Sequence, residues 1–199
     1  MTTLRDRIDS GDLVVGIVGL GYVGLPLALE FAKVGIKVIG LDVIDEKVAE
    51  IAARRSYVGD VPTEELGPLV AEGLIEATAD FDRLSECDVV SVCVPTPLGK
   101  TKEPDLSYVL NATESVAKRL REQQLVLLES TTYPGTTEEV VLPTLEASGL
   151  EVGKDFYLAF SPERVDPGNP TYGVKNTPKV VGGMTKDCTE LATAVYEKA

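Results

Sequence analysis

Three glycines in one short segment, Gly19, Gly21 and Gly24, carry the clearest chemical signal in the sequence. A GxGxxG pattern indicates a dinucleotide site when it follows a buried strand, opens a helix and precedes an acid about 20 residues downstream. These conditions are met here, and the acid is Asp42. In such a turn the first glycine permits the bend and the second admits a pyrophosphate to the backbone. The third lets the helix pack closely on the sheet.

The residues around this turn suggest how a cofactor would be held. Tyr22 and Val23 complete the turn, and amides at a helix N-terminus attract phosphates without the help of a lysine. Asp42 is expected to accept hydrogen bonds from the adenosine ribose and to repel a 2′-phosphate, which favours NAD over NADP. Lys47 could reach the adenosine, with a solvated surface lysine as the equal alternative. A glycine-rich turn that binds nothing is the alternative for the whole motif.

Four polar residues follow the ends of other predicted strands. Thr96, Thr131, Thr132 and Glu163 all fall just beyond an apolar run. Ligands of open α/β sheets bind at the carboxyl ends of the strands, so these residues are candidates for a second half of the site. Each also has a structural explanation: Thr96 could stiffen a proline-rich loop, the paired threonines could cap a turn, and Glu163 could pair with a surface cation.

Short apolar runs alternate along the chain with segments of helical periodicity. Strands are expected at residues 13–18, 37–42, 75–78, 88–94, 125–129, 156–160 and 179–182, and helices at 22–34, 45–55, 105–120, 136–148 and from 185. Residues 56–73 are expected to form a loop with at most a short helix. We expect Asp105 to cap its helix and Pro143 to kink the helix that contains it. The alternation predicts an α/β fold, a Rossmann-like doubly wound, mostly parallel sheet with helices on both faces.

Composition excludes several classes of function. The 199 residues carry a net charge of −13, unlike the basic surface of a nucleic-acid binder. The chain has no histidine, which removes Ser-His-Asp triads and histidine-ligated metals from this stretch. Cys87, Cys93 and Cys188 have no metal-like spacing, so no metal site is expected, and their odd number suggests a reducing cytoplasm. The uncharged run at 13–29 is too glycine-rich, and too short against the ~20 residues required, for a membrane span.

Several motifs, taken in order, resemble the nucleotide-sugar 6-dehydrogenases, which oxidise UDP-sugars to UDP-uronic acids. The matching segments are GLGYVGLPL at 19–27, CVPTPL at 93–98, PDLS at 104–107, ESTTYPG at 129–135 and SPERVDPGN at 161–169. Together they cover nearly the whole chain. The set is far more specific than the glycine motif alone.

The resemblance implies a four-electron oxidation that uses two NAD molecules. In the family, the C6 alcohol becomes an aldehyde, is trapped by a cysteine thiol, is oxidised to a thioester and is then hydrolysed. By match to the family motifs, Thr132 lies beside the reacting carbon and Thr131 on the nicotinamide side. Glu163 is the acid/base for the hydrolytic water. Thr96, with Val94 and Pro95 before it, matches a cofactor-contacting loop.

Residues 1–199 lack several segments of the family pattern. The family's nucleophilic cysteine lies in a Cys-Phe-Pro-Lys segment, and no such segment is present. The connecting helix and the UDP-sugar-binding domain have no counterpart either. The chain is therefore expected to be the NAD-binding half of an enzyme that is a homo-oligomer when intact. It should bind NAD without turning over.

The family resemblance leaves open which sugar is the substrate, and two alternative functions of the chain remain. A UDP-N-acetylhexosamine is the favoured substrate, with UDP-glucose and UDP-N-acetylmannosamine still open. The N-terminal domain of a β-hydroxyacid dehydrogenase and a non-catalytic NAD-binding module are the alternative readings of the chain.

Overall fold

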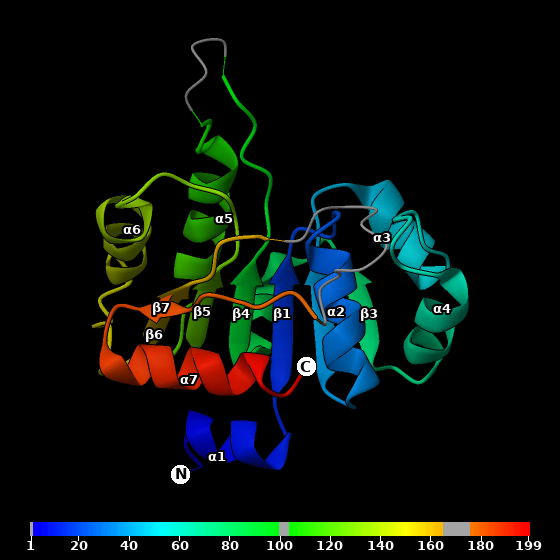
Figure 1. The fold of residues 1–199 in the computed structure, drawn as a ribbon, viewed down its shortest axis with the longest axis horizontal. Coiled ribbons are helices and arrows are strands. Elements are labelled where there is room, and N and C mark those ends of the chain that lie inside the picture. Colours follow the sequence, from blue (N-terminus) through cyan, green and yellow to red (C-terminus); the bar gives the residue numbers. More distant parts are fainter. Residues whose placement is uncertain (1, 100–103, 165–175) are drawn as a thin grey trace.

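The computed structural model describes residues 2–99, 104–164 and 176–199. Within them, strands form a sheet in the order β3-β2-β1-β4-β5-β6-β7, in which neighbours from β3 to β6 are parallel and β7 is antiparallel to β6 (Figure 1). The strands are β1 Val14–Val18, β2 Lys37–Leu41, β3 Ile75–Thr78, β4 Val89–Val92, β5 Leu125–Leu128, β6 Tyr157–Phe160 and β7 Gly182–Gly183. This confirms the predicted doubly wound Rossmann-like fold, whose strand order reverses between β1 and β4.

Helices cover both faces of the sheet. They are α1 Leu4–Ser10, α2 Gly24–Lys33, α3 Asp45–Ala52, α4 Thr63–Ala71, α5 Ser107–Ala117, α6 Leu142–Glu146 and α7 Lys186–Tyr196, with a 3-10 segment at Phe81–Glu86 and a π segment at Thr137–Val141. Figure 1 shows α2 and α7 in front of the sheet, and the buried faces of α5 and α6 belong to the opposite core.

Alternation along each strand divides the apolar side chains between the two cores. In β1, Val15 and Ile17 pack with α2, whereas Val18 packs with the core under α5. The central strands β4 and β5 are buried at every position, as expected where helices cover both faces. The result is a rigid scaffold that fixes the ends of β1, β4 and β5 side by side.

Two predicted elements differ from the structure. The segment at 56–73, predicted as a loop with at most a short helix, contains the nine-residue helix α4, whose buried Leu66 anchors it and whose first turn carries Glu64 and Glu65. Acidic residues near a helix N-terminus and the burial of Leu66 both stabilise α4, which contains Pro68 in its interior. The predicted strand at 179–182 is reduced to the two residues of β7. The preceding segment crosses the front of the sheet before it reaches the edge (Figure 1).

The remaining differences concern the starts of two helices and one helix that was not predicted. The predicted helix at 136–148 begins as a π turn and becomes α-helical at Leu142. Pro143 cannot donate to the carbonyl of the preceding turn, and a wider turn accommodates it. Asp105 is not the cap of α5. Leu106 holds that position, and the Asp105 carboxylate accepts from the Ser107 amide at 2.9 Å. The short α1 was not predicted at all.

Candidate functional site

The glycine turn joins β1 to α2 at the carboxyl edge of the sheet. Gly19 has φ +96°, and a Cβ there would lie 2.7 Å from the carbonyl oxygen of Cys93. A Cβ on Gly24 would overlap the carbonyl oxygen of Gly19, so a side chain would push α2 off the turn. Gly21 is different, because a Cβ there would meet no described atom within 4 Å. The open side of the turn is therefore at Gly21, where a ligand can approach the backbone.

The start of α2 leaves its backbone donors available. In the described part of the chain, the amides of Gly21, Tyr22 and Val23 donate to no other residue, and Val23 provides no side-chain cap for the helix. The Tyr22 side chain is 64% exposed, and Val23 is half-buried against the core. Uncapped amides at a helix N-terminus are a ready anion site, so this turn fits a pyrophosphate.

Asp42 lies directly after β2, next to the turn, and is only 5% exposed. Its Oδ2 accepts from the Leu20 amide at 2.8 Å and from the Lys47 ammonium at 2.9 Å, and its Oδ1 accepts from the Ile44 amide at 3.0 Å. Lys47 is thus paired with Asp42 rather than extended into solvent. Among the described partners, Oδ1 keeps one acceptor position, which is enough for one ribose hydroxyl.

The loops after β4 and β5 are bound to each other. The Thr96 hydroxyl donates to the carbonyl of Thr131 at 2.6 Å, and the Ser130 hydroxyl donates to the carbonyl of Val94 at 2.8 Å. Thr131 is exposed and the neighbouring Thr132 is half-buried. The structure therefore brings the predicted residues Val94, Pro95, Thr96, Thr131 and Thr132 to one place at the sheet edge.

Glu163 follows β6 at the same edge. Its Oε1 accepts from the Arg164 amide at 2.7 Å, and its side chain is half-buried. Its negative charge contributes to raising the pKa of the Cys93 thiol, after burial and the charge of Glu129. Glu163 thus faces the same end of β4 that carries the cofactor loop.

Glu129 is a buried carboxylate that the sequence analysis did not single out. It follows β5, is 1% exposed, and is paired with the Lys179 ammonium. Its Oε2 also accepts from the Tyr196 hydroxyl at 2.9 Å and from the Ser91 hydroxyl at 3.3 Å. Burial and the Glu129 charge raise the pKa of Tyr196, which keeps its hydroxyl a donor. The sequence signals were an acid at the end of an apolar run and its place at the start of the ESTTYPG segment, neither of which indicated a partner.

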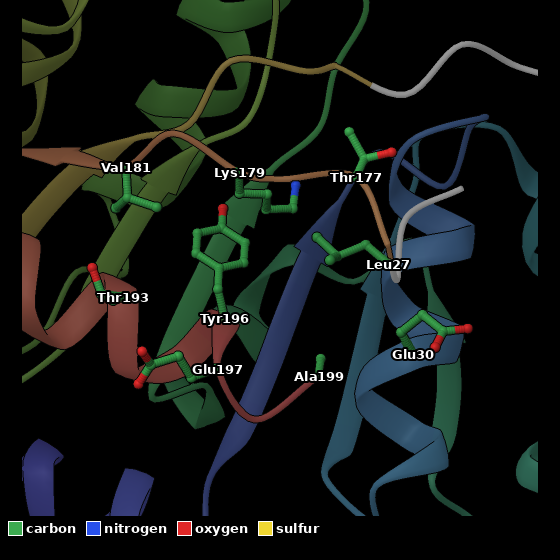
Figure 2. A pocket seen from close by; sticks show the side chains of 9 residues that line it. All are labelled: Leu27, Glu30, Thr177, Lys179, Val181, Thr193, Tyr196, Glu197 and Ala199. Carbon is green, nitrogen blue, oxygen red and sulfur yellow. The ribbon is translucent and has the colours of Figure 1, made fainter. Parts of the chain in front are cut away.

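A cavity of about 250 Å³ lies beside this cluster, between α2 and α7 (Figure 2). Figure 2 shows Lys179 above the ring of Tyr196, and the Lys179 nitrogen is 4.9 Å from the ring centroid. Leu27 and Glu30 line the cavity from α2. The hydrogen bond between Tyr196 and Glu129 therefore joins α7 to the carboxyl end of β5.

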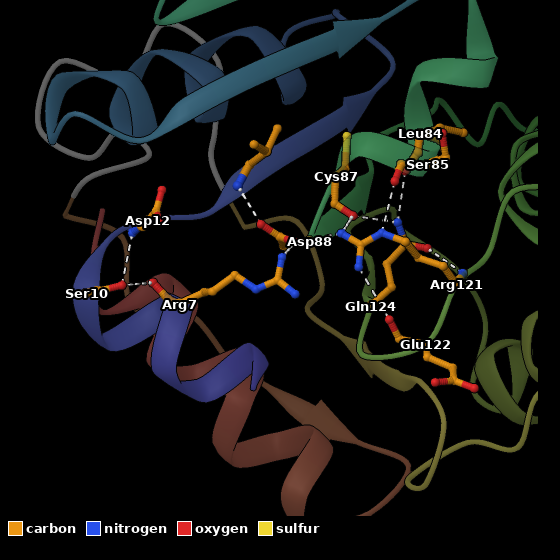
Figure 3. A network of polar contacts seen from close by, with 11 residues as sticks. Arg7, Ser10, Asp12, Leu84, Ser85, Cys87, Asp88, Arg121, Glu122 and Gln124 are labelled. Carbon is orange, nitrogen blue, oxygen red and sulfur yellow. Dashed lines mark hydrogen bonds and ion pairs between the residues drawn. The ribbon is translucent and has the colours of Figure 1, made fainter. Parts of the chain in front are cut away.

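A second buried ion cluster lies at the opposite end of the strands, where they begin (Figure 3). Asp88, 3% exposed, is paired with Arg7 and Arg121 and accepts from the Val14 amide at 3.0 Å. Gln124 donates to the carbonyl of Cys87 at 2.8 Å in the same network. Because ligands bind at the other end of parallel strands, we assign this cluster to fastening α1 beneath the sheet.

Comparisons with known proteins identify the family. Residues 13–199 match the family model described as "UDP-glucose/GDP-mannose dehydrogenase family, NAD binding domain". The chain belongs to this family. The resemblance predicted from the motifs is therefore confirmed, and so is NAD as the cofactor of this domain. The open glycine turn with its available amides fits that cofactor.

Individual relatives are similar over nearly the whole chain. A UDP-N-acetyl-D-glucosamine 6-dehydrogenase of Pseudomonas aeruginosa is 39% identical over 188 residues, which are 94% of this chain and 44% of that protein. The structure of a UDP-D-ManNAc dehydrogenase from Pyrococcus horikoshii has a TM-score of 0.87 and 34% identity over 94% of this chain and 44% of its own. An NDP-N-acetyl-D-galactosaminuronic acid dehydrogenase from Methanosarcina mazei has a TM-score of 0.89 and 33% identity, covering 100% of this chain and 45% of its own.

These likenesses cover only part of each relative. The chain spans less than half the length of these relatives. A 3-hydroxyisobutyrate dehydrogenase from Salmonella typhimurium, at 19% identity and a TM-score of 0.62, shares the fold alone. Within the described residues, no helix is both long and apolar enough to cross a bilayer.

Proposed function

We propose that this chain is the NAD-binding half of a dehydrogenase that oxidises a UDP-N-acetylhexosamine at C6 to the uronic acid, with two NAD per sugar. UDP-glucose is the second candidate substrate. The observation that carries the proposal is the likeness, over nearly all of the chain, to a UDP-N-acetyl-D-glucosamine 6-dehydrogenase. The arrangement of the sheet edge supports it, because the glycine turn and the two threonine-bearing loops lie on neighbouring strands.

The roles of the residues follow from their positions along that edge. Gly19, Gly21 and Gly24, with the amides of Tyr22 and Val23, form the pyrophosphate seat. The adenosine side is formed by Asp42 and Lys47, and the nicotinamide side by Val94, Pro95, Thr96 and Thr131. Bound NAD supplies the hydride acceptor in both oxidations.

Thr132 and Glu163 take the catalytic roles in this proposal. The half-buried Thr132 hydroxyl orients the reacting oxygen or its water, which is the position where a fixed donor lowers a barrier. Glu163 moves the proton of the hydrolytic water. A half-buried carboxylate at the sheet edge is suited to such general acid/base work.

In our proposal, none of the three cysteines of this chain is the catalytic nucleophile. Cys87, Cys93 and Cys188 are 0%, 6% and 0% exposed, and burial raises the pKa of Cys87 to about 12. A thiol attacks as its thiolate; burial also raises the pKa of Cys93, and all three thiols are closed off from solvent. We propose that residues 1–199 form one NAD-binding domain and that a separate domain provides the cysteine and the UDP-sugar site. The intact enzyme is then a cytoplasmic homo-oligomer.

The test is turnover by the complete product of the gene that encodes this chain. We expect two NADH for each UDP-N-acetylhexosamine consumed, and lower kcat/KM with UDP-glucose. One NADH for each sugar would exclude the four-electron reaction. Equal or higher kcat/KM with UDP-glucose would reassign the substrate. The isolated chain is expected to bind NAD and to produce no NADH with any of these sugars.

A further inference from the structure

A tyrosine outside the dinucleotide motif holds the glycine turn. Tyr57 lies in the loop between α3 and α4, and its hydroxyl donates a 2.6 Å hydrogen bond to the carbonyl oxygen of Leu20. Leu20 is the residue between the first two glycines of the motif, and Tyr57 is 37 residues away in sequence. This contact therefore reaches the centre of the turn from a separate element.

Leu20 is anchored at its other groups as well. Its amide donates to the Asp42 carboxylate at 2.8 Å. Its side chain is fully buried over Gly40, where an added Cβ would lie 2.6 Å from Leu20 Cδ2. With the amide and the side chain fixed, the carbonyl is the remaining group that decides how the following peptide plane is rotated.

Peptide geometry connects that carbonyl to the cofactor. The carbonyl of Leu20 and the amide of Gly21 belong to one planar trans peptide, so their directions are opposite and move together. Gly21 is the open position of the turn, and its amide donates to no described residue. A hydrogen bond at the carbonyl also polarises the peptide and strengthens its N–H as a donor.

We propose that Tyr57 is a positioning residue for NAD: by holding the Leu20 carbonyl, its hydroxyl aims the Gly21 amide at the pyrophosphate. The inference rests on NAD binding at the glycine turn and adds a residue that the motif does not contain.

The loop that carries Tyr57 is built to hold it. The Ser56 amide donates to the Thr63 hydroxyl at 3.0 Å, and the Val61 amide donates to the Val58 carbonyl at 3.0 Å. Val58 and Val61 are buried in the core beneath α2. Burial, and then the negative charge of Asp42, raise the pKa of Tyr57. The hydroxyl thus keeps its proton and donates throughout the neutral range.

The variant Tyr57→Phe tests this by removing one oxygen atom. The matched control is Tyr157→Phe, which removes a hydroxyl from a half-buried tyrosine at the other end of the sheet. Both variants of the 199-residue chain are titrated with NAD, with ADP-ribose and with adenosine. The first two ligands carry the pyrophosphate, whereas adenosine carries only the base and ribose.

We expect Tyr57→Phe to raise the Kd for NAD and ADP-ribose by roughly three- to tenfold, the effect of one hydrogen bond, and to leave adenosine unchanged. In ¹⁵N spectra without ligand, the Gly21 amide signal should shift more than signals outside the turn. Tyr157→Phe should match the parent chain with every ligand.

Three results would overturn the inference. They are an unchanged Kd for NAD, an equal loss of adenosine binding, and a Tyr57→Phe chain that does not fold, since the last would assign the hydroxyl to the fold. Failure of the parent chain to bind NAD would instead refute the cofactor role of the glycine turn itself, so the two failures are distinguishable.

Discussion

Replacement of Asp42 by alanine should change the preference of the chain between NAD and NADP. The Asp42 carboxylate accepts from the Leu20 amide, the Ile44 amide and the Lys47 ammonium. In our proposal its removal takes away the acceptor for the adenosine ribose. It also releases the Lys47 ammonium from its 2.9 Å pair with Asp42, which frees a cation to attract a 2′-phosphate. Asp42→Ala should therefore weaken NAD and strengthen NADP at the same time.

The magnitudes follow from the bonds that are lost. A hydrogen bond to a charged group contributes about 1.5–3 kcal/mol, so losing the one to the ribose should raise the Kd for NAD by about 10- to 100-fold. NADP should then bind at least as well as NAD. The Leu20 and Ile44 amides lose their acceptors; Ile44 is exposed to water, but the Leu20 amide is buried, and a buried donor without an acceptor costs about 1–3 kcal/mol. The free energy of unfolding should fall by about 1–3 kcal/mol.

Calorimetric titration of the parent chain and three variants separates these effects. Asp42→Asn is the control that keeps an acceptor oxygen but removes the charge, and it should gain NADP affinity with a smaller loss of stability. Adding Lys47→Ala to Asp42→Ala should abolish the gain in NADP affinity. If Asp42→Ala still prefers NAD by the same factor as the parent chain, Asp42 does not read the ribose and the reasoning fails.

Four further substitutions or treatments probe the same edge. Gly21→Ala places a methyl in the open approach, so calorimetry should show roughly tenfold weaker NAD binding while Tm changes by about 2 °C or less. Gly24→Ala collides with the Gly19 carbonyl and should lower the free energy of unfolding in urea by about 1–3 kcal/mol, and an unchanged midpoint would contradict this packing. Thr132→Ala should leave NAD affinity intact and lower kcat of the complete enzyme by about 100-fold; a large loss of NAD binding would move Thr132 to the cofactor site. Because burial raises the pKa of Cys87 to about 12 and closes off the chain's other thiols, a disulfide reagent at pH 8 should react with the folded chain only slowly, and rapid labelling would contradict the burial.

Much of the fold was predictable because its signals are local and strong. The runs that become β4 and β5 are buried at every position and apolar at all but Ser91, and glycines mark where helices stop. Gly35 takes φ +85° after α2 and Gly149 takes φ +89° after α6, as helix-ending glycines do. The glycine motif was informative because strand, turn, helix and acid all agreed.

The short helix α1 was not predicted because its local sequence signals are weak. Thr3 and Asp6 form a capping box, and Gly11 closes the helix with φ +77°. Only Leu4 and Ile8 are buried, so the apolar pattern is too short to indicate a helix by itself. Packing beneath the sheet, with Arg7 paired to Asp88, gives this helix its stability.

The contacts within the site could not be predicted because they join segments distant in sequence. Glu129 and Lys179 are 50 residues apart, and nothing in either segment indicates the other. The same holds for Thr96 and Thr131, whose loops become neighbours only because β4 and β5 pair. Residues 165–175, which include most of the SPERVDPGN motif, lie outside the described residues, so of that motif only residues 161–164 are described.

The central claim is that the carboxyl edge of this sheet binds NAD through the turn at residues 19–24 and selects it through Asp42. Calorimetric titration of the 199-residue chain with NAD and, separately, with NADP tests it most directly. We predict saturable binding of one NAD per chain, with NADP weaker by about tenfold or more because its 2′-phosphate meets the Asp42 carboxylate. Absence of NAD binding, or equal affinity for the two cofactors, would contradict the account.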